Sequence, residues 1–224
     1  MDSSGALTIC ESVLPALGEP ARRPWNRFCR ILAGSAELAM ENYDRALELL
    51  SAVRKDMDLL PVIHDWYWKM LLESGFTEAW LGKGDLGQAR VSAERFLEVT
   101  QQTSEDTWHA LAWDAIARVA MAELDAQRTQ NCISRALSAI DGFEVPLAAW
   151  RVHSTAAKVF GDAGNTDLAR HHLELSRATL LKLADSLSEE ESLQKTFLAA
   201  PEVDRVFAAA AALDGRAQIN PSQE

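Results

Sequence analysis

The chain has 224 residues, 48% hydrophobic and 25% charged, which is typical of a globular protein rather than a disordered one. Its 22 Lys and Arg against 33 Asp and Glu give a formal net charge of −11, which disfavours nucleic acid and anionic membrane surfaces as partners. The cysteines Cys10, Cys29 and Cys132 form no CxxC pair, and no signal-like or membrane-spanning segment is evident, so we expect free thiols and a cytoplasmic protein.

Prolines and glycines punctuate the start of the chain, so we expect residues 1–21 to form a cap helix or a loose arm. After this segment, apolar residues recur at spacings of three and four, which is the pattern of amphipathic helices. Strand signals are nearly absent, so the sequence predicts an all-α fold. The helices are expected at 25–40, 43–55, 62–81, 86–101, 107–124, 126–140, 146–160 and 168–187.

A short segment recurs between pairs of these helices. The four copies align without gaps at 41–46, 84–89, 124–129 and 164–169, at intervals of 43, 40 and 40 residues. Small side chains recur in register with the copies, as is needed where two helices cross closely. They are Gly34, Thr77, Ala117 and Ala157, paired with Ala46, Ala89, Thr129 and Ala169. Trp25, Trp68 and Trp108 also repeat in phase, and we expect them to pack between helix pairs.

The small residue, the turn of form Gly-Asp/Asn-Tyr/Leu-x-x-Ala and the second helix resemble tetratricopeptide repeats over residues 22–186. The period is longer than the usual 34 or so residues, and Glu41 and Leu124 replace the turn glycine. Long units of this kind are similar to TPR regions of bacterial transcription activators and signalling ATPases. The resemblance implies a right-handed α-solenoid of about four antiparallel hairpins, at about 22–60, 61–103, 104–144 and 145–187. Capping helices are expected at 188–214 and a disordered tail at 215–224.

In tetratricopeptide repeats the first helix of each hairpin lines a concave groove, and the resemblance projects that groove onto this chain. Arg118, Arg151 and Lys158 are expected to clamp a carboxylate of a partner peptide. The alternative is that these charges solvate one face or pair with Asp114. The projected groove residues are Arg27, Met70, Ser74, Glu78, Leu111, Asp114, Arg118, Arg151, Ser154 and Lys158.

Motifs that carry chemistry are weak in this sequence. Residues 82–87 match G-x-G-x-x-G, but they follow a helix and coincide with a repeat turn, so we interpret them as a turn. No two histidines have the i, i+4 spacing of a zinc site on one helix, and no nucleophile–base constellation is evident. We therefore expect no enzyme activity, no cofactor and no metal. Trp66, Trp80 and Trp150 are out of phase with the repeat and are candidates for exposed contacts.

The expected function is a protein-interaction scaffold that binds a peptide or helix of a partner protein in the groove. The alternative is a regulatory or sensory region of a signalling or transcription-regulating protein. Such a region would respond to a small effector or to its own self-association, including homodimer formation.

Overall fold

The computed structural model describes residues 2–18 and 22–219, and all regular structure within them is helical, which confirms the all-α fold class. Eight of the helices, α2 to α9, lie where the sequence pattern predicts helices. The elements are α1 Ser3–Val13, η1 Leu14–Leu17, α2 Arg23–Ala39, α3 Tyr43–Leu59, α4 Asp65–Lys83, α5 Leu86–Thr100, α6 Asp106–Ala122, α7 Ala126–Ile140, α8 Pro146–Asp162, α9 Thr166–Asp185, α10 Glu191–Leu198 and α11 Pro201–Ile219.

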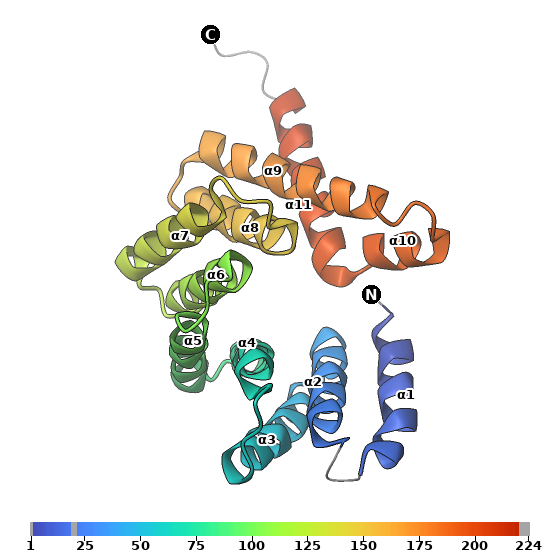
Figure 1. The fold of residues 1–224 in the computed structure, drawn as a ribbon. Coiled ribbons are helices and arrows are strands. Elements are labelled where there is room, and N and C mark those ends of the chain that lie inside the picture. The colour runs from blue at the N-terminus through green and yellow to red at the C-terminus, as the bar shows by residue number, and fades with distance from the viewer. Residues whose placement is uncertain (1, 19–21, 220–224) are drawn as a thin grey trace.

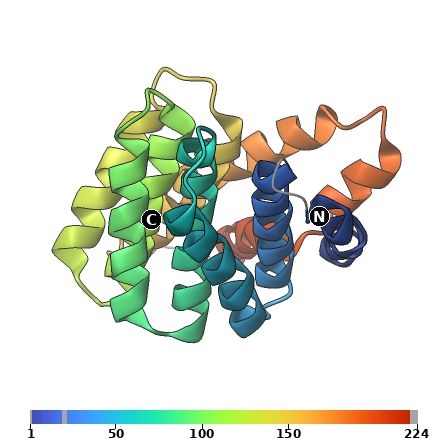
Figure 2. The ribbon, with the colours of Figure 1, turned by 60° about the horizontal axis from the view of Figure 1, so that its bottom comes forward.

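Consecutive helices pack in pairs: α2 on α3, α4 on α5, α6 on α7 and α8 on α9. The first helices of the pairs also contact one another in series, α2 with α4, α4 with α6 and α6 with α8. The pairs follow an arc from α1 at one end to α10 and α11 at the other, with α2, α4, α6 and α8 on its inner side (Figure 1). In Figure 2, a view turned by 60°, consecutive helices from α2 to α9 again lie beside one another.

The recurring segment forms the same turn in each pair. Its first residue adopts a left-handed backbone conformation in all four copies, with φ of 61° at Glu41, 75° at Gly84, 61° at Leu124 and 78° at Gly164. In each copy the next amide donates to a carbonyl five residues earlier, for example Asp85 N to Trp80 O at 3.0 Å, as in a Schellman motif. The G-x-G-x-x-G match is one of these turns, which confirms its interpretation.

Replacing Leu124 by Gly is expected to raise the free energy of unfolding by about 1 kcal/mol, because a side chain in the left-handed region is strained. Leu124 is 90% exposed, so little packing is lost. Urea unfolding measures the change. Gly164→Ala is the matched control, since an added Cβ there meets nothing within 4 Å and the backbone alone determines the loss of stability. A Leu124→Gly variant that is less stable than the wild type would contradict the prediction.

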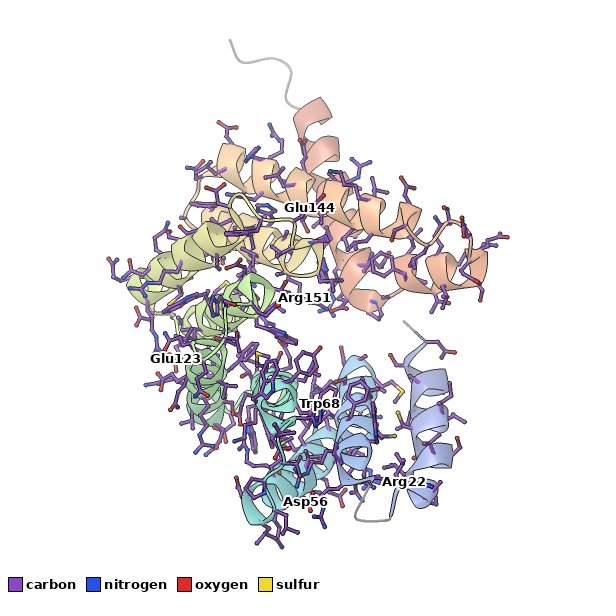
Figure 3. The ribbon with its side chains drawn as sticks, in the orientation of Figure 1. Arg22, Asp56, Trp68, Glu123, Glu144 and Arg151 are labelled. Atoms are coloured by element: carbon purple, nitrogen blue, oxygen red, sulfur yellow. The ribbon has the colours of Figure 1, made fainter. Side chains whose placement is uncertain are left out.

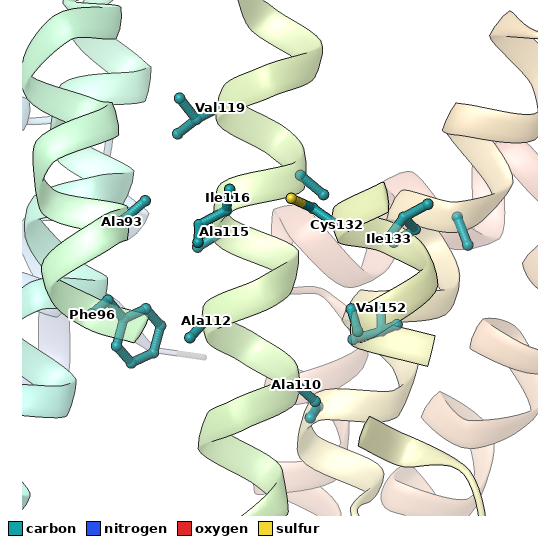
Figure 4. Packing of buried hydrophobic residues seen from close by; sticks show 14 of the residues in the cluster. Ala93, Phe96, Ala110, Ala112, Ala115, Ile116, Val119, Cys132, Ile133 and Val152 are labelled. Carbon is teal, nitrogen blue, oxygen red and sulfur yellow. The ribbon is translucent and has the colours of Figure 1, made fainter. Parts of the chain in front are cut away.

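The core is built where the pairs meet. Its largest cluster joins α4 to α8 through small side chains such as Ala93 and Ala115 and larger ones such as Val152 and Phe96 (Figure 4). The repeated small residues are buried, as predicted, and they allow close helix crossings. At Gly34 an added Cβ would lie 3.1 Å from Leu50 Cδ2 on α3. A second cluster joins α2, α3 and α4, and a third joins α8 and α9 to the C-terminal helices.

Both ends of the array carry additional helices. At the N-terminus, α1 and η1 pack on α2. At the C-terminus, α11 packs on α9 and α10 contacts both. Residues 186–189 form a turn, and α10 begins at Glu191. Helix α11 continues to Ile219, into the segment expected to be a tail, because its alanine-rich sequence favours helix. Residues 220–224 lie outside the described part.

Candidate functional site

Side chains one repeat apart meet on the inner side of the arc. Glu78 on α4 and Arg118 on α6 are 40 residues apart and occupy equivalent positions in successive units. Arg118 Nη1 donates to Glu78 Oε2 at 2.9 Å, and Nη2 donates to the other carboxylate oxygen. Arg118 Nε also donates to Asp114 Oδ2 at 3.0 Å, one turn earlier on α6. The contact between α4 and α6 thus brings three of the projected groove residues into one cluster.

The pKa values of the two carboxylates in this cluster shift in opposite directions. Asp114 is 2% exposed, and burial raises its pKa despite the nearby Arg118 charge and the Thr155 side chain. Burial acts the same way on Glu78, but the charge and hydrogen bonds of Arg118 outweigh it and lower the Glu78 pKa. Asp114 Oδ1 is buried without a hydrogen-bond partner. Arg118 therefore favours the ionised form of both carboxylates, and its effect outweighs burial only at Glu78.

Arg151 lies on α8, the next helix along the inner side (Figure 3). Its Nη2 donates to both carboxylate oxygens of Glu202 on α11, at 3.0 and 3.1 Å. The guanidinium also lies over the Trp150 ring, 4.3 Å from the centroid. Arg118 and Arg151 thus already pair with carboxylates of the same chain. The alternative of internal pairing, considered from the sequence, holds for Arg118 with Asp114, while Glu78 and Glu202 are partners that sequence reasoning missed.

The remaining projected groove residues differ in accessibility. Arg27 and Met70 are 1% and 0% exposed, so both belong to the interior and are out of a partner's reach in this structure. Arg27 is fixed by Asp56 and Asp65, on α3 and α4. Asp114 is likewise buried, whereas the residues open to solvent in part or in full are Ser74, Glu78, Leu111, Arg118, Arg151, Ser154 and Lys158.

Aromatic rings form a continuous set on α2, α4 and α6. Trp68 stacks on Phe28 at a centroid distance of 4.3 Å, and Tyr67 meets the Trp68 ring edge-on at 4.8 Å and Trp108 at 6.3 Å. Trp68, labelled in Figure 3, has a buried Nε1 without a hydrogen-bond partner. Tyr67 is 39% exposed and adds an accessible ring that the tryptophan pattern alone did not indicate.

The repeat phase predicted which tryptophans are packed and which are exposed, and this prediction is only partly correct. Trp66 is 53% exposed, as predicted. Trp80 is half-buried between the cluster of α4 to α8 and the cluster of α2 to α4. Trp150 is 5% exposed, so the prediction of exposed contacts is wrong for Trp150. Trp150 is buried because the C-terminal helices complete the cluster around it. Trp25, expected to pack between pairs, is 61% exposed because the first pair has no earlier pair beside it.

Two imidazoles meet between α8 and α9. His153 Nδ1 and His172 Nδ1 are 3.1 Å apart, so one ring donates and the other accepts. Phe160 stacks on His172, and His171 is adjacent. Burial, followed by the charges of His172 and His171, lowers the pKa of His153 to about 4, and burial also lowers that of His172. The pair is therefore neutral at pH 7 and resists protonation in the folded state.

This pair predicts a loss of stability in mild acid. The unfolded chain binds a proton at His153 near pH 6.5, but the folded chain does so only near pH 4, so unfolding becomes easier as the pH falls between these values. Between pH 7 and pH 5 the wild type is expected to lose about 1–2 kcal/mol more than a His153→Gln variant. Urea unfolding at a series of pH values measures this difference. Parallel pH profiles for the two proteins would contradict it.

Within residues 2–18 and 22–219, no group of three or more His, Cys, Asp or Glu side chains is arranged to hold a metal ion. None of the described helices combines the length and apolarity needed to cross a membrane.

Comparison with known proteins gives a likeness in fold. No family model matches the chain, and no curated protein matches it in sequence. The structure is similar to the crystal structure of BtubC (BKLC) from P. vanneervenii, with a TM-score of 0.61 and 12% sequence identity, over 100% of this chain and 94% of that one. At this identity the likeness concerns the helical fold.

Proposed function

We propose that this chain is a protein-interaction scaffold of the tetratricopeptide-repeat kind, a right-handed solenoid of four helical hairpins. It binds a peptide or helix of a partner protein along α2, α4, α6 and α8. The observation that carries the proposal is the contact between Glu78 and Arg118, which occupy equivalent positions 40 residues apart on neighbouring inner helices. Such contacts arise when successive units stack side by side, which is how repeat proteins build an extended binding face.

The chemistry of the inner surface indicates how a partner would bind. Arg151 and Arg118 already pair with Glu202 and Glu78, so an acidic partner must compete with internal carboxylates. Lys158 is exposed on α8 and offers a cation to the partner. On α4 and α6, Tyr67 and the partly exposed Trp108 provide apolar contact for the partner. Mixed aromatic and hydrogen-bonding surfaces are typical of peptide-binding sites.

A second candidate is a regulatory region that binds a small effector on the same inner helices. It is favoured by Trp68 Nε1 and Asp114 Oδ1, two buried polar atoms without a hydrogen-bond partner, on α4 and α6. Leaving a buried polar atom unpaired costs about 1–3 kcal/mol, and a bound polar ligand that reorganises these side chains would recover part of that cost.

Site-specific photo-crosslinking tests the scaffold proposal. A photoreactive amino acid at Ser154 on α8 is expected to crosslink a protein partner in cell extract, whereas the same group at Glu174, exposed on the outer helix α9, is not. The crosslink is expected to weaken when Lys158→Glu is added. Equal crosslinking from both positions would overturn the proposed groove. If no protein is captured but a cellular metabolite raises the unfolding temperature, the effector-binding candidate is favoured instead.

A further inference from the structure

Two of the three cysteines lie together between the first two helices. Cys10 on α1 and Cys29 on α2 are 5% and 8% exposed, in a small cluster with Ala33 and Leu49. The Sγ of Cys29 donates to the carbonyl oxygen of Cys10 at 3.5 Å. Burial and the neighbouring Cys10 thiol raise the pKa of Cys29 to about 11. A disulfide requires Cα atoms about 4.4–6.8 Å apart, and the contact between the Cys29 thiol and the Cys10 backbone places the two residues side by side.

We propose that Cys10 and Cys29 form a redox-modification site, where a low-molecular-weight disulfide such as oxidised glutathione converts the two thiols into a disulfide that fixes α1 to α2. One protein thiolate attacks a sulfur of the reagent, forms a mixed disulfide and releases one small thiol. The second protein thiolate then attacks the protein sulfur of the mixed disulfide and releases the other small thiol. Two protein thiols are oxidised, the reagent is reduced to two thiols, and these carry the two protons.

The pairing distinguishes these residues from the third cysteine. Cys132 on α7 is also buried, but it belongs to the largest cluster and lies near the charged groups of Arg128 and Arg135. It belongs to a different helix pair from Cys10 and Cys29. Cys132 therefore serves as an internal control that shares their burial but not their location.

Access to the pair depends on α1. A buried thiol of high pKa is a poor nucleophile at neutral pH, so exchange requires α1 to open transiently. Helix α1 packs mainly on α2 and η1, at the end of the array, and elements with few neighbours open at low free-energy cost. In the reduced protein, opening exposes the apolar face around Ala33 and Leu49. In the oxidised protein this face stays covered.

The experiment uses the full-length chain in glutathione buffers of increasing oxidised-to-reduced ratio, quenched with acid, alkylated and analysed by intact and peptide mass spectrometry. The wild type and Cys132→Ala are expected to lose two alkylatable thiols and to yield a peptide crosslinked between Cys10 and Cys29. Cys10→Ala and Cys29→Ala are expected to form no internal crosslink. In the oxidised wild type, hydrogen exchange of α1 amides is expected to slow by on the order of tenfold, because opening is restricted.

Two results would overturn the proposal. One is a folded wild type in which Cys10 and Cys29 stay reduced in glutathione buffers that oxidise them when the chain is unfolded in urea. The other is glutathione retained on Cys10 or Cys29 without an internal crosslink. The exchange comparison uses only oxidised and reduced wild type, so it remains decisive if a cysteine variant fails to fold.

Discussion

Replacing Arg27 by Met is expected to lower the free energy of unfolding by about 3–5 kcal/mol, the range for breaking a buried ion pair by removing one partner. The guanidinium donates to Asp56 Oδ2 and Asp65 Oδ1, both at 2.6 Å, and to the carbonyl oxygens of Asp56 and Leu60 at 2.8 and 2.7 Å. Met retains most of the apolar stem but leaves the buried Asp65 carboxylate without its cation.

Arg27 also determines the local chain path. Its partners lie on α3, α4 and the loop between them, and Asp65 Oδ2 accepts a hydrogen bond from the Val62 amide at 2.8 Å. Losing Arg27 therefore removes a set of hydrogen bonds that connects α2 to the next helix pair. We expect increased hydrogen exchange around residues 60–65 in addition to the global loss of stability.

Urea unfolding with circular dichroism measures the Arg27→Met effect, with Arg27→Lys as the conservative variant. Lys keeps the charge but cannot form the fork of hydrogen bonds, so an intermediate stability is expected. Arg45→Met is the control, because Arg45 forms an exposed ion pair with Glu48 and its loss is expected to leave the unfolding midpoint unchanged. Equal midpoints for wild type and Arg27→Met would show that the buried network contributes no net stability.

Replacing Arg118 by Met is expected to cost about 2–3 kcal/mol at pH 7, less than a fully buried pair because the Arg118 side chain remains 30% exposed. The main cause is Asp114, whose buried carboxylate loses its cation. Without Arg118 the pKa of Asp114 rises further, and that of Glu78 is no longer lowered.

The pH dependence has a definite sign. A carboxyl with a raised folded-state pKa destabilises the protein while ionised, and this penalty disappears as the pH falls through that pKa. Meanwhile the wild type loses the contribution of Glu78 below its unfolded pKa near 4.5. The difference between wild type and Arg118→Met is therefore expected to shrink as the pH falls from 7 to 4.

Urea unfolding at each pH tests this, and Asp114→Asn combined with Arg118→Met completes a double-mutant cycle. The double variant is expected to be more stable than Arg118→Met alone, because no uncompensated buried charge remains. Lys158→Met, at the equivalent exposed position on α8, is the control and should change stability by under about 0.5 kcal/mol. A pH-independent difference would assign the effect to packing rather than to charge.

Local features of the fold could be predicted from sequence. The helix positions of α2 to α9 follow from apolar spacing, and the four turns follow from a recurring segment. At Glu41 and Leu124 the turn keeps the left-handed conformation without glycine. Backbone hydrogen bonds within a few residues, and the close crossing at small residues such as Gly34, act over short stretches of chain, so a linear pattern records them.

The character of the inner surface was decided by tertiary structure. The resemblance to tetratricopeptide repeats projected Arg27, Asp114 and Arg151 onto one open groove, yet Arg27 and Asp114 are buried and Arg151 pairs with Glu202. Arg27 lies 38 residues from Asp65, and Arg151 lies 51 residues from Glu202. Burial and ion pairing depend on which distant side chains arrive beside a residue, and that is determined by how helices stack and by where α11 ends the array. Helical periodicity fixes the direction of a side chain, whereas its environment is fixed only when the neighbouring helices are in place.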